Sequence, residues 1–288
     1  MRYESYIFDL YGTLVDIRTD EEREELWDKL ALFYGYYDAH YTPEELKRRY
    51  GELVSGSEER LKERLDGEAA AGNETEGRAC SDGETEAADG AVHRKDDVHE
   101  SHPEIKIEQV FAALFQEKGV IADETLAVHA GQFFRILSTE YVRLYDGVVK
   151  VLKTLRAAGS KVYLLSNAQR IFTEYEMHTL GIADYFDDIL ISSEYGVKKP
   201  DGRFFKALID KHQIDVSRAV MIGNDAVSDI LGARRAGLFT CYIHSNISPE
   251  LPVEEKRNDA GEIVEVPVMP EADHVLKEMD MEALLKIL

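Results

Sequence analysis

The sequence predicts an α/β protein with a parallel β-sheet core and an all-helical module inserted after the first strand. Short apolar, β-prone runs alternate with helical patterns in the second half of the chain. This alternation requires crossover connections, which favour parallel strands. The apolar run Tyr6-Ile7-Phe8 near the N-terminus reads as one more buried strand. Helical patterns occupy the residues that follow it, so its neighbours must come from the second half.

Composition limits the partners. The chain has 288 residues and can bury a substantial core. Its 34 Lys+Arg against 56 Asp+Glu give a net charge of −22, which excludes nucleic acid and anionic membrane as partners. An anionic substrate would therefore need local cations or a metal.

The two cysteines, Cys80 and Cys241, are far apart and form no CxxC motif, which fits a reducing compartment. With neither a signal-peptide pattern nor an apolar run of membrane-spanning length, we expect a cytoplasmic protein acting on a small molecule. No sequence feature specifies an oligomeric state.

The helical module begins after Asp16, where the strand-like pattern ends. Thr19-Asp20-Glu21-Glu22 is typical of a helix start, and apolar residues then recur at helical spacing up to Gly35. Thr42-Pro43 is a second N-cap signal, for a helix that reaches Leu65. From residue 66 to about residue 102 the segment is rich in Gly, Ala, Glu, Asp and Thr, and we expect a disordered insertion.

Helical periodicity returns after Pro103 and continues in a second helix from Asp123 to about Leu144. Residues 17–141 are therefore predicted to form a helical cap that contains the insertion. Residues 1–16 and 142–288 are predicted to form the α/β core. Its helices are expected at 148–158, 170–179, 201–212 and 225–236, and its strands at 161–165, 189–191, 219–222 and 239–243. A loop or hairpin around 259–261 and a closing helix at 282–288 complete the chain.

Four polar clusters follow four predicted strands. They are Asp9 to Thr13, Ser166-Asn167, Lys199-Pro200-Asp201, and Gly223-Asn224-Asp225 with Asp229. Each cluster alone has a structural explanation, since Asp, Ser and Asn favour turns and helix caps and acids favour helix N-termini. The carboxyl ends of parallel strands, however, meet at one edge of the sheet, where ligands bind in α/β folds. Four such clusters in order favour one functional site.

With these four motifs the chain resembles the haloacid dehalogenase-like (HAD) hydrolase superfamily with a C1-type helical cap, over nearly its whole length apart from the 66–102 insertion. The resemblance implies a Rossmann-like core and a covalent mechanism. Asp9 corresponds to the nucleophile, which forms an aspartyl intermediate. Thr13 would hold the nucleophile loop, Lys199 would offset negative charge, and Ser166 and Asn167 would bind the phosphoryl group together with Lys199.

The resemblance also implies Mg²⁺ as cofactor, since phosphatases of the superfamily hold it with oxygen ligands. The nucleophile Asp9, the backbone carbonyl of Tyr11 and Asp225 correspond to these ligands. Asn224 and Asp229 are the alternative or supporting ligands, and Asn224 occupies the position where phosphatases usually carry the first acid of this motif.

Tyr11 is the main departure from the pattern of the superfamily's phosphatases. These usually carry a second aspartate at this position, which acts as general acid and base. A phenol with a pKa of about 10 is a poorer proton donor near neutral pH than a carboxylic acid. Tyrosine at this position is a feature of 2-haloacid dehalogenases, whose halide leaves without a proton.

We expect a Mg²⁺-dependent phosphatase that acts on a small phosphorylated metabolite. Its substrate would have a good leaving group, as an acyl phosphate or a sugar phosphate does. A 2-haloacid dehalogenase-like hydrolase and a degenerate phosphate-binding protein are the alternatives.

Overall fold

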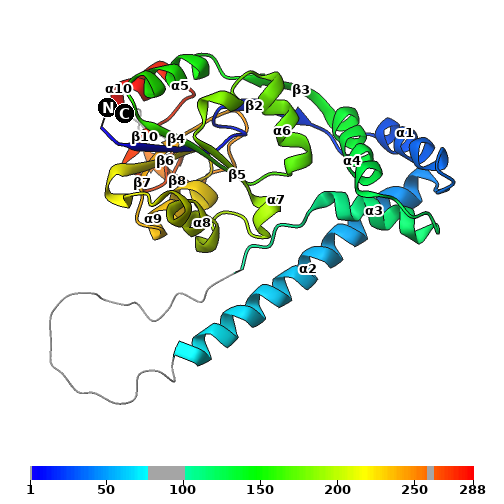
Figure 1. Cartoon of the computed structure of the whole chain (residues 1–288). Coiled ribbons are helices and arrows are strands. Elements are labelled where there is room, and N and C mark those ends of the chain that lie inside the picture. Colours follow the sequence, from blue (N-terminus) through cyan, green and yellow to red (C-terminus); the bar gives the residue numbers. More distant parts are fainter. Residues whose placement is uncertain (1, 77–100, 258–262) are drawn as a thin grey trace.

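The computed structural model describes residues 2–76, 101–257 and 263–288 (Figure 1). Within these ranges the core is a six-stranded parallel sheet of order β10-β7-β6-β1-β4-β5. The strands are β1 (Ser5–Phe8), β4 (Lys161–Ser166), β5 (Asp188–Ile191), β6 (Ala219–Gly223), β7 (Phe239–Ile243) and β10 (His274–Leu276). The first strand does pair with strands of the second half, β4 and β6, as predicted.

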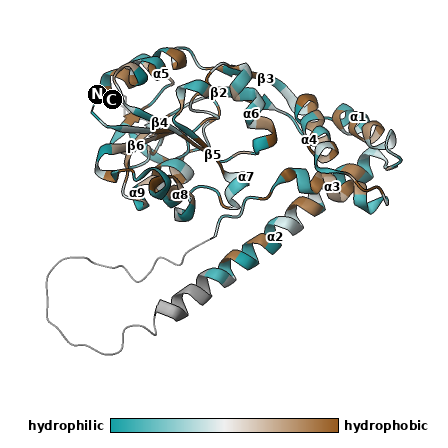
Figure 2. Cartoon of the chain, in the orientation of Figure 1, coloured by the Kyte–Doolittle hydropathy of each residue, from teal (hydrophilic) through white to brown (hydrophobic). Residues whose placement is uncertain are grey.

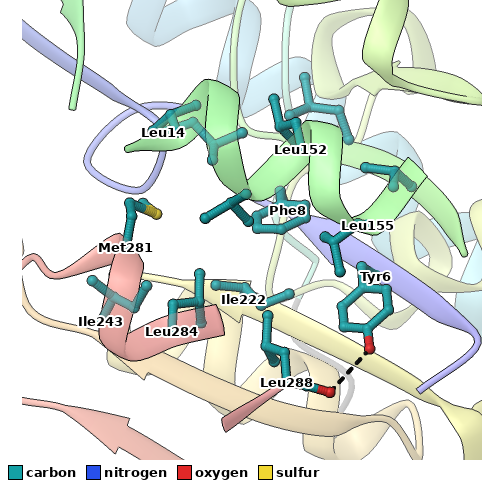
Figure 3. Packing of buried hydrophobic residues seen from close by; sticks show 14 of the residues in the cluster. Tyr6, Phe8, Leu14, Leu152, Leu155, Ile222, Ile243, Met281, Leu284 and Leu288 are labelled. Carbon is teal, nitrogen blue, oxygen red and sulfur yellow. Dashed lines mark hydrogen bonds between the residues drawn. The ribbon is translucent and has the colours of Figure 1, made fainter. Parts of the chain in front are cut away.

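Helices cover both faces of this sheet. On one face, α5 (Val148–Ala157) and α10 (Met281–Ile287) bury apolar side chains against Tyr6 and Phe8 of β1 (Figure 3). The Tyr6 hydroxyl donates to the backbone oxygen of Leu288 at 3.3 Å, which attaches the C-terminus to the first strand. On the other face, α8 (Gly202–His212) and α9 (Gly232–Arg235) pack against a second cluster that includes Ile7. Burial on both faces explains why the strands read as continuous apolar runs.

The cap has its own hydrophobic core between α1 (Glu24–Gly35), α2 (Pro43–Glu76), α3 (Ile107–Glu117) and α4 (Glu124–Ser138). Trp27, Tyr34, Phe111 and Phe134 are buried there, and their rings contact one another or neighbouring aromatic rings. The predicted N-cap at Thr42 is present, since its hydroxyl accepts the Glu45 N–H at 3.2 Å. In the part of α2 that Figure 2 colours by hydropathy, hydrophilic and hydrophobic positions alternate along the ribbon.

The base of the cap is not helical, contrary to the sequence prediction. The helix expected to reach Leu144 ends at Ser138, and Thr139–Leu144 forms β3. This strand pairs antiparallel with β2 (Val15–Thr19), where a helix start was expected at Thr19. Thr, Tyr and Val in 139–142 favour a strand, and a partner strand distant in sequence decides the outcome.

The sequence prediction also placed the start of the disordered insertion too early in the chain. Helix α2 continues to Glu76, eleven residues past Leu65. Residues 66–76 are rich in Ala and Glu, and extending an existing helix by such residues requires no new nucleation. At the other end, Ser101 is buried and the backbone of His102 bonds to Lys198 and Asp201. Residues 77–100, which include Cys80, lie outside the described residues.

The remaining elements follow the predicted order closely. Helix α6 (Arg170–Thr179) is as expected, while the helix predicted at 225–236 is a π-helical segment, η3 (Ala226–Leu231), followed by α9. Strands β8 (Val253–Arg257) and β9 (Ile263–Pro267) pair antiparallel around 259–261, which lies outside the described residues. Short elements not anticipated are η1 (Ala183–Tyr185), α7 (Ser192–Tyr195), η2 (Val216–Arg218) and β10. No helix in the described ranges is long and apolar enough to cross a membrane.

Candidate active site

The loop after β1 is folded tightly around Asp9. The Asp9 N–H still donates to Ile222 of β6 at 2.9 Å, so the residue is held at the end of the sheet. Gly12 has φ +85°, and a Cβ there would lie 2.1 Å from the Asn224 side-chain nitrogen. Only glycine allows both this backbone conformation and the close approach of the loop to Asn224.

Lys199 joins two of the predicted clusters. Its Nζ lies 2.7 Å from Asp9 Oδ1 and 2.7 Å from Asp229 Oδ1, and all three residues are buried. Burial opposes the charge of Lys199, but the Asp229 and Asp9 carboxylates outweigh it and raise its pKa. The ammonium therefore stays charged and holds the nucleophile candidate in one orientation.

Asp229 lies beneath the end of β6. Its Oδ2 accepts the Asp225 N–H at 3.0 Å while Oδ1 accepts from Lys199. A Cβ on Gly223 would lie 2.2 Å from Asp229 Oδ2, so this glycine makes room for the carboxylate. Burial raises the pKa of Asp229 to about 7, with Lys199 acting in the opposite direction. The neighbouring Asp225 caps η3, as its Oδ1 accepts the N–H groups of Val227 and Ser228.

Thr13 and Asn224 connect the nucleophile loop to the loop after β6. The Thr13 hydroxyl lies 3.3 Å from Asn224 Oδ1 and 3.5 Å from Asp9 Oδ2. Asn224 in turn donates to Ser248 Oγ at 3.4 Å, a residue for which the sequence offered no signal. Thr13 therefore contacts both Asp9 and the loop after β6.

Ser166 is the last residue of β4 and Asn167 follows it, and the two side chains have different surroundings. The Asn167 side chain bonds both backbone groups of Lys199, through Oδ1 at 2.8 Å and Nδ2 at 2.9 Å. It therefore positions Lys199, in addition to lining the cavity described below. Among the described residues, the Ser166 hydroxyl is the fully buried side-chain polar atom without a hydrogen-bond partner. Such an orphan group is unusual in a folded protein. Ser166 does not line the cavity described below.

The side chain of Tyr11 is directed into a polar cluster between core and cap. Its hydroxyl donates to Glu176 Oε2 on α6 at 2.5 Å and lies 3.1 Å from Thr173 Oγ1. Arg135 of α4 binds Glu176 with Nε and Nη2, at 2.7 and 3.2 Å. Burial, followed by the Glu176 charge, raises the pKa of the Tyr11 phenol. Nothing in the sequence pattern pointed to Arg135, Thr173 or Glu176 as partners of Tyr11.

A cavity of about 190 Å³ lies over these groups. Its lining residues, all from the core, are Asp9, Tyr11, Asn167, Lys199, Asn224, Asp225, Ser228, Asp229, Ile247 and Pro249. Ile247 and Pro249 come from the loop after β7 and Ser228 from η3, and the sequence analysis anticipated none of the three. A polar pair, Ser245-Asn246, which is separated from the end of β7 by His244 alone, was the available signal for this fifth strand-end loop.

The lining suits a hard divalent cation. Three carboxylates, those of Asp9, Asp225 and Asp229, face the single ammonium of Lys199. The donors are oxygens, without histidine or cysteine, which suits Mg²⁺. No group of three or more His, Cys, Asp or Glu side chains in residues 2–76, 101–257 and 263–288 forms a metal cage by itself.

The parallel sheet carries a cap, and an aspartate–lysine–aspartate site lies at the edge of the sheet. Together, this fold and this site define a class of hydrolases. Residues 3–237 match the family model of haloacid dehalogenase-like hydrolases. The chain therefore belongs to this family.

Curated relatives match parts of the chain. It is 37% identical over 101 residues to the pyrimidine 5'-nucleotidase YjjG of Escherichia coli (strain K12), covering 35% of this chain and 44% of that protein. It is 30% identical over 159 residues to the phosphoserine phosphatase of Thermus thermophilus, covering 55% of this chain and 63% of that protein. The matches thus span less than two thirds of these relatives.

Solved structures resemble most or nearly all of the chain at low identity. A HAD phosphatase from Thermococcus onnurineus superposes with a TM-score of 0.50 at 16% identity, covering 99% of this chain and 97% of the other. A 2-haloacid dehalogenase from Pseudomonas syringae pv. Tomato DC3000 has a TM-score of 0.50 at 20% identity, with 84% and 86% covered. At these identities the likeness shows the shared fold alone.

Proposed function

We propose that the protein is a Mg²⁺-dependent phosphatase that acts on a small phosphorylated metabolite through an aspartyl-phosphate intermediate on Asp9. The observation that supports this most is the placement of Lys199 Nζ at 2.7 Å from both Asp9 and Asp229 in the cavity wall. The salt bridge orients Asp9, whose carboxylate attacks phosphorus. The relatives with phosphatase names support the same reaction class.

The cavity charge explains the need for a metal. One ammonium against three carboxylates leaves the site negative, which repels a phosphate dianion. Asp9, the Tyr11 backbone carbonyl and Asp225 would hold Mg²⁺, with Asn224 and Asp229 as alternative or supporting ligands. When bound, the ion supplies the positive charge that screens the phosphoryl oxygens. Ser166, with its orphan hydroxyl, and Asn167 would donate hydrogen bonds to the same oxygens.

The test is phosphate release from a panel of small phosphomonoesters and acyl phosphates, with Mg²⁺ and with EDTA. Asp9→Asn should abolish release, whereas Asp210→Asn, which removes an exposed carboxylate on α8, should leave it unchanged. Release that persists in Asp9→Asn, or that EDTA does not affect, would contradict the proposal.

A 2-haloacid dehalogenase is the second candidate, and Tyr11 is the observation that favours it. Halide departs without a proton, so no acid is needed at this position. A haloacid also carries its own carboxylate, yet the cavity's single cation already binds two carboxylates. Chloride release from 2-chloropropionate without added metal, lost in Asp9→Asn, would establish this activity in place of the phosphatase.

A further inference from the structure

A second cavity, of about 470 Å³, lies between the long cap helix α2 and the core. The α2 side is lined by Ser57, Arg60, Leu61 and Arg64. The other lining residues belong to the segment that leads into α3 and to α7 with the glycine that follows it (Figure 1). The volume is within the roughly 300–1,000 Å³ of small-molecule sites. None of the twelve lining residues borders the cavity at Asp9, so the two cavities are separate.

Three cations line this second cavity, Arg60, Arg64 and Lys106, in a chain whose net charge is −22. Arg60 donates to the Ser57 hydroxyl at 3.0 Å, and neither Arg60 nor Lys106 forms an ion pair with a described carboxylate. Arg64 has a loose contact with Glu68 at 3.9 Å. Arg60 and Arg64 are four positions apart on α2, where like charges repel each other. A bound anion would relieve this repulsion.

The two carboxylates of the same lining bind other groups. Glu194 pairs with Arg170, with 3.0 Å between the charged atoms. Glu104 accepts the Gln169 side-chain amide on Oε1 at 2.8 Å and the Ser192 hydroxyl on Oε2 at 3.0 Å. Neither carboxylate therefore neutralises the lining cations, and their positive charge is left for a ligand.

Neutral side chains complete the lining. Ser193 is buried, and its Oγ accepts the Arg170 N–H at 3.0 Å. Its own O–H can therefore donate to a ligand oxygen. Leu61, Ile105 and Tyr195 supply apolar surface, and 38% of Tyr195 is exposed. The cavity thus combines cations and a hydroxyl for anionic oxygens with an aromatic ring for an organic group.

We infer that this second cavity binds a diphosphate, either inorganic or as part of a nucleotide. Guanidinium groups bind phosphate oxygens with paired hydrogen bonds, and a lysine adds a point charge. A single phosphate group carries at most about two negative charges, so three cations match a diphosphate better. Because the lining comes from both α2 and α7, the ligand would contact the cap helix and the core at once. Its binding is independent of the proposed phosphatase reaction.

The test is isothermal titration calorimetry of the full-length protein with sodium pyrophosphate and with adenosine diphosphate, both in EDTA. Without a metal, the cavity at Asp9 presents three carboxylates against one ammonium and does not attract these anions. Arg60→Gln and Lys106→Gln should each weaken binding by about fivefold or more, because each removes a charge-assisted hydrogen bond. Both side chains are exposed, so the melting temperatures without ligand should stay close to wild type.

Arg48→Gln is the matched control. It removes the same charge from the same helix, but Arg48 pairs with Glu52 and does not line the cavity, so affinity should change by less than about twofold. An equal loss in Arg48→Gln and Arg60→Gln would overturn the inference, because it would indicate diffuse attraction.

The absence of binding by both compounds would overturn the inference as well. Tyr195→Leu distinguishes the two sources of the diphosphate. Tighter binding of adenosine diphosphate that this variant abolishes supports the site and assigns it a nucleotide. Equal affinities that the variant leaves unchanged support the site and assign it inorganic diphosphate.

Discussion

Arg135 of cap helix α4 and Glu176 of core helix α6 form an ion pair across the junction of the two domains, with the Tyr11 hydroxyl as a third member. The Arg135 and Glu176 side chains are only 18% and 8% exposed. The guanidinium also lies 5.6 Å from the centre of the Tyr11 ring. Tyr11, two positions after the proposed nucleophile Asp9, is thereby tied to the position of the cap.

Replacing Arg135 should destabilise the protein, because it leaves the buried Glu176 carboxylate without a counter-charge. We expect Arg135→Met to lower the free energy of unfolding by about 3 kcal/mol. The double variant Arg135→Met/Glu176→Gln should recover much of this loss. Urea unfolding measures both. As a control, Lys206→Met breaks an exposed i,i+4 pair with Asp210 and should cost less than about 0.5 kcal/mol. Equal losses for Arg135→Met and Lys206→Met would argue against the buried pair.

Gly12→Ala should impair both stability and activity, because its Cβ would overlap Asn224 and its φ is positive. The matched control is Gly159→Ala, which has a similar φ of +76° but no atom within 4 Å of the added Cβ. The backbone strain is about 1 kcal/mol in each. Thermal unfolding should show the larger loss for Gly12→Ala, and phosphate release should fall in that variant alone. A smaller effect at Gly12 than at Gly159 would mean that the loop adapts to the methyl group.

Asn224→Asp should strengthen Mg²⁺ binding. The substitution adds a fourth carboxylate to the cavity lining and keeps an oxygen acceptor for the Thr13 hydroxyl. We expect the dissociation constant for Mg²⁺ to fall by about tenfold, which corresponds to about 1.4 kcal/mol. Isothermal titration calorimetry with MgCl₂ measures this without any substrate. Asp9→Asn should weaken binding in the same assay. Unchanged affinity in both variants would place the metal elsewhere.

Asp16 should make stability depend on pH at the base of the cap. Burial raises the pKa of this carboxyl, but hydrogen bonds from Asn246 and Arg143 outweigh burial and lower it overall. A lowered pKa in the folded state means that the carboxylate stabilises the protein above its unfolded pKa of about 4, and that this contribution disappears as the pH falls through the folded value.

The measurement is the free energy of unfolding of wild type and Asp16→Asn across pH. Wild type should be more stable by about 2 kcal/mol at pH 7, the scale of hydrogen bonds to a charged group. The difference should shrink below about pH 4. A difference that is independent of pH would show that the Asp16 charge makes no contribution.

Much of the fold was open to prediction from sequence because the relevant signals are local. Buried parallel strands are short apolar runs, so β1, β4, β6 and β7 were located to within one residue. The β2–β3 pair was missed, because Thr139–Leu144 reads equally well as the end of a helix when its partner strand is unknown. The length of α2 was missed because low apolar content does not prevent an existing helix from extending.

The same distinction applies to the site. The sequence by itself determined which side chains gather, since parallel strands end at one edge and bring Asp9, Lys199 and Asp229 within hydrogen-bonding distance. Only the tertiary structure decided what those side chains and their neighbours bind. Asn167 bonds the Lys199 backbone, the Tyr11 hydroxyl donates to Glu176, and Ile247 forms part of the wall. Side-chain direction depends on partners that are distant along the chain, and local periodicity carries no information about them.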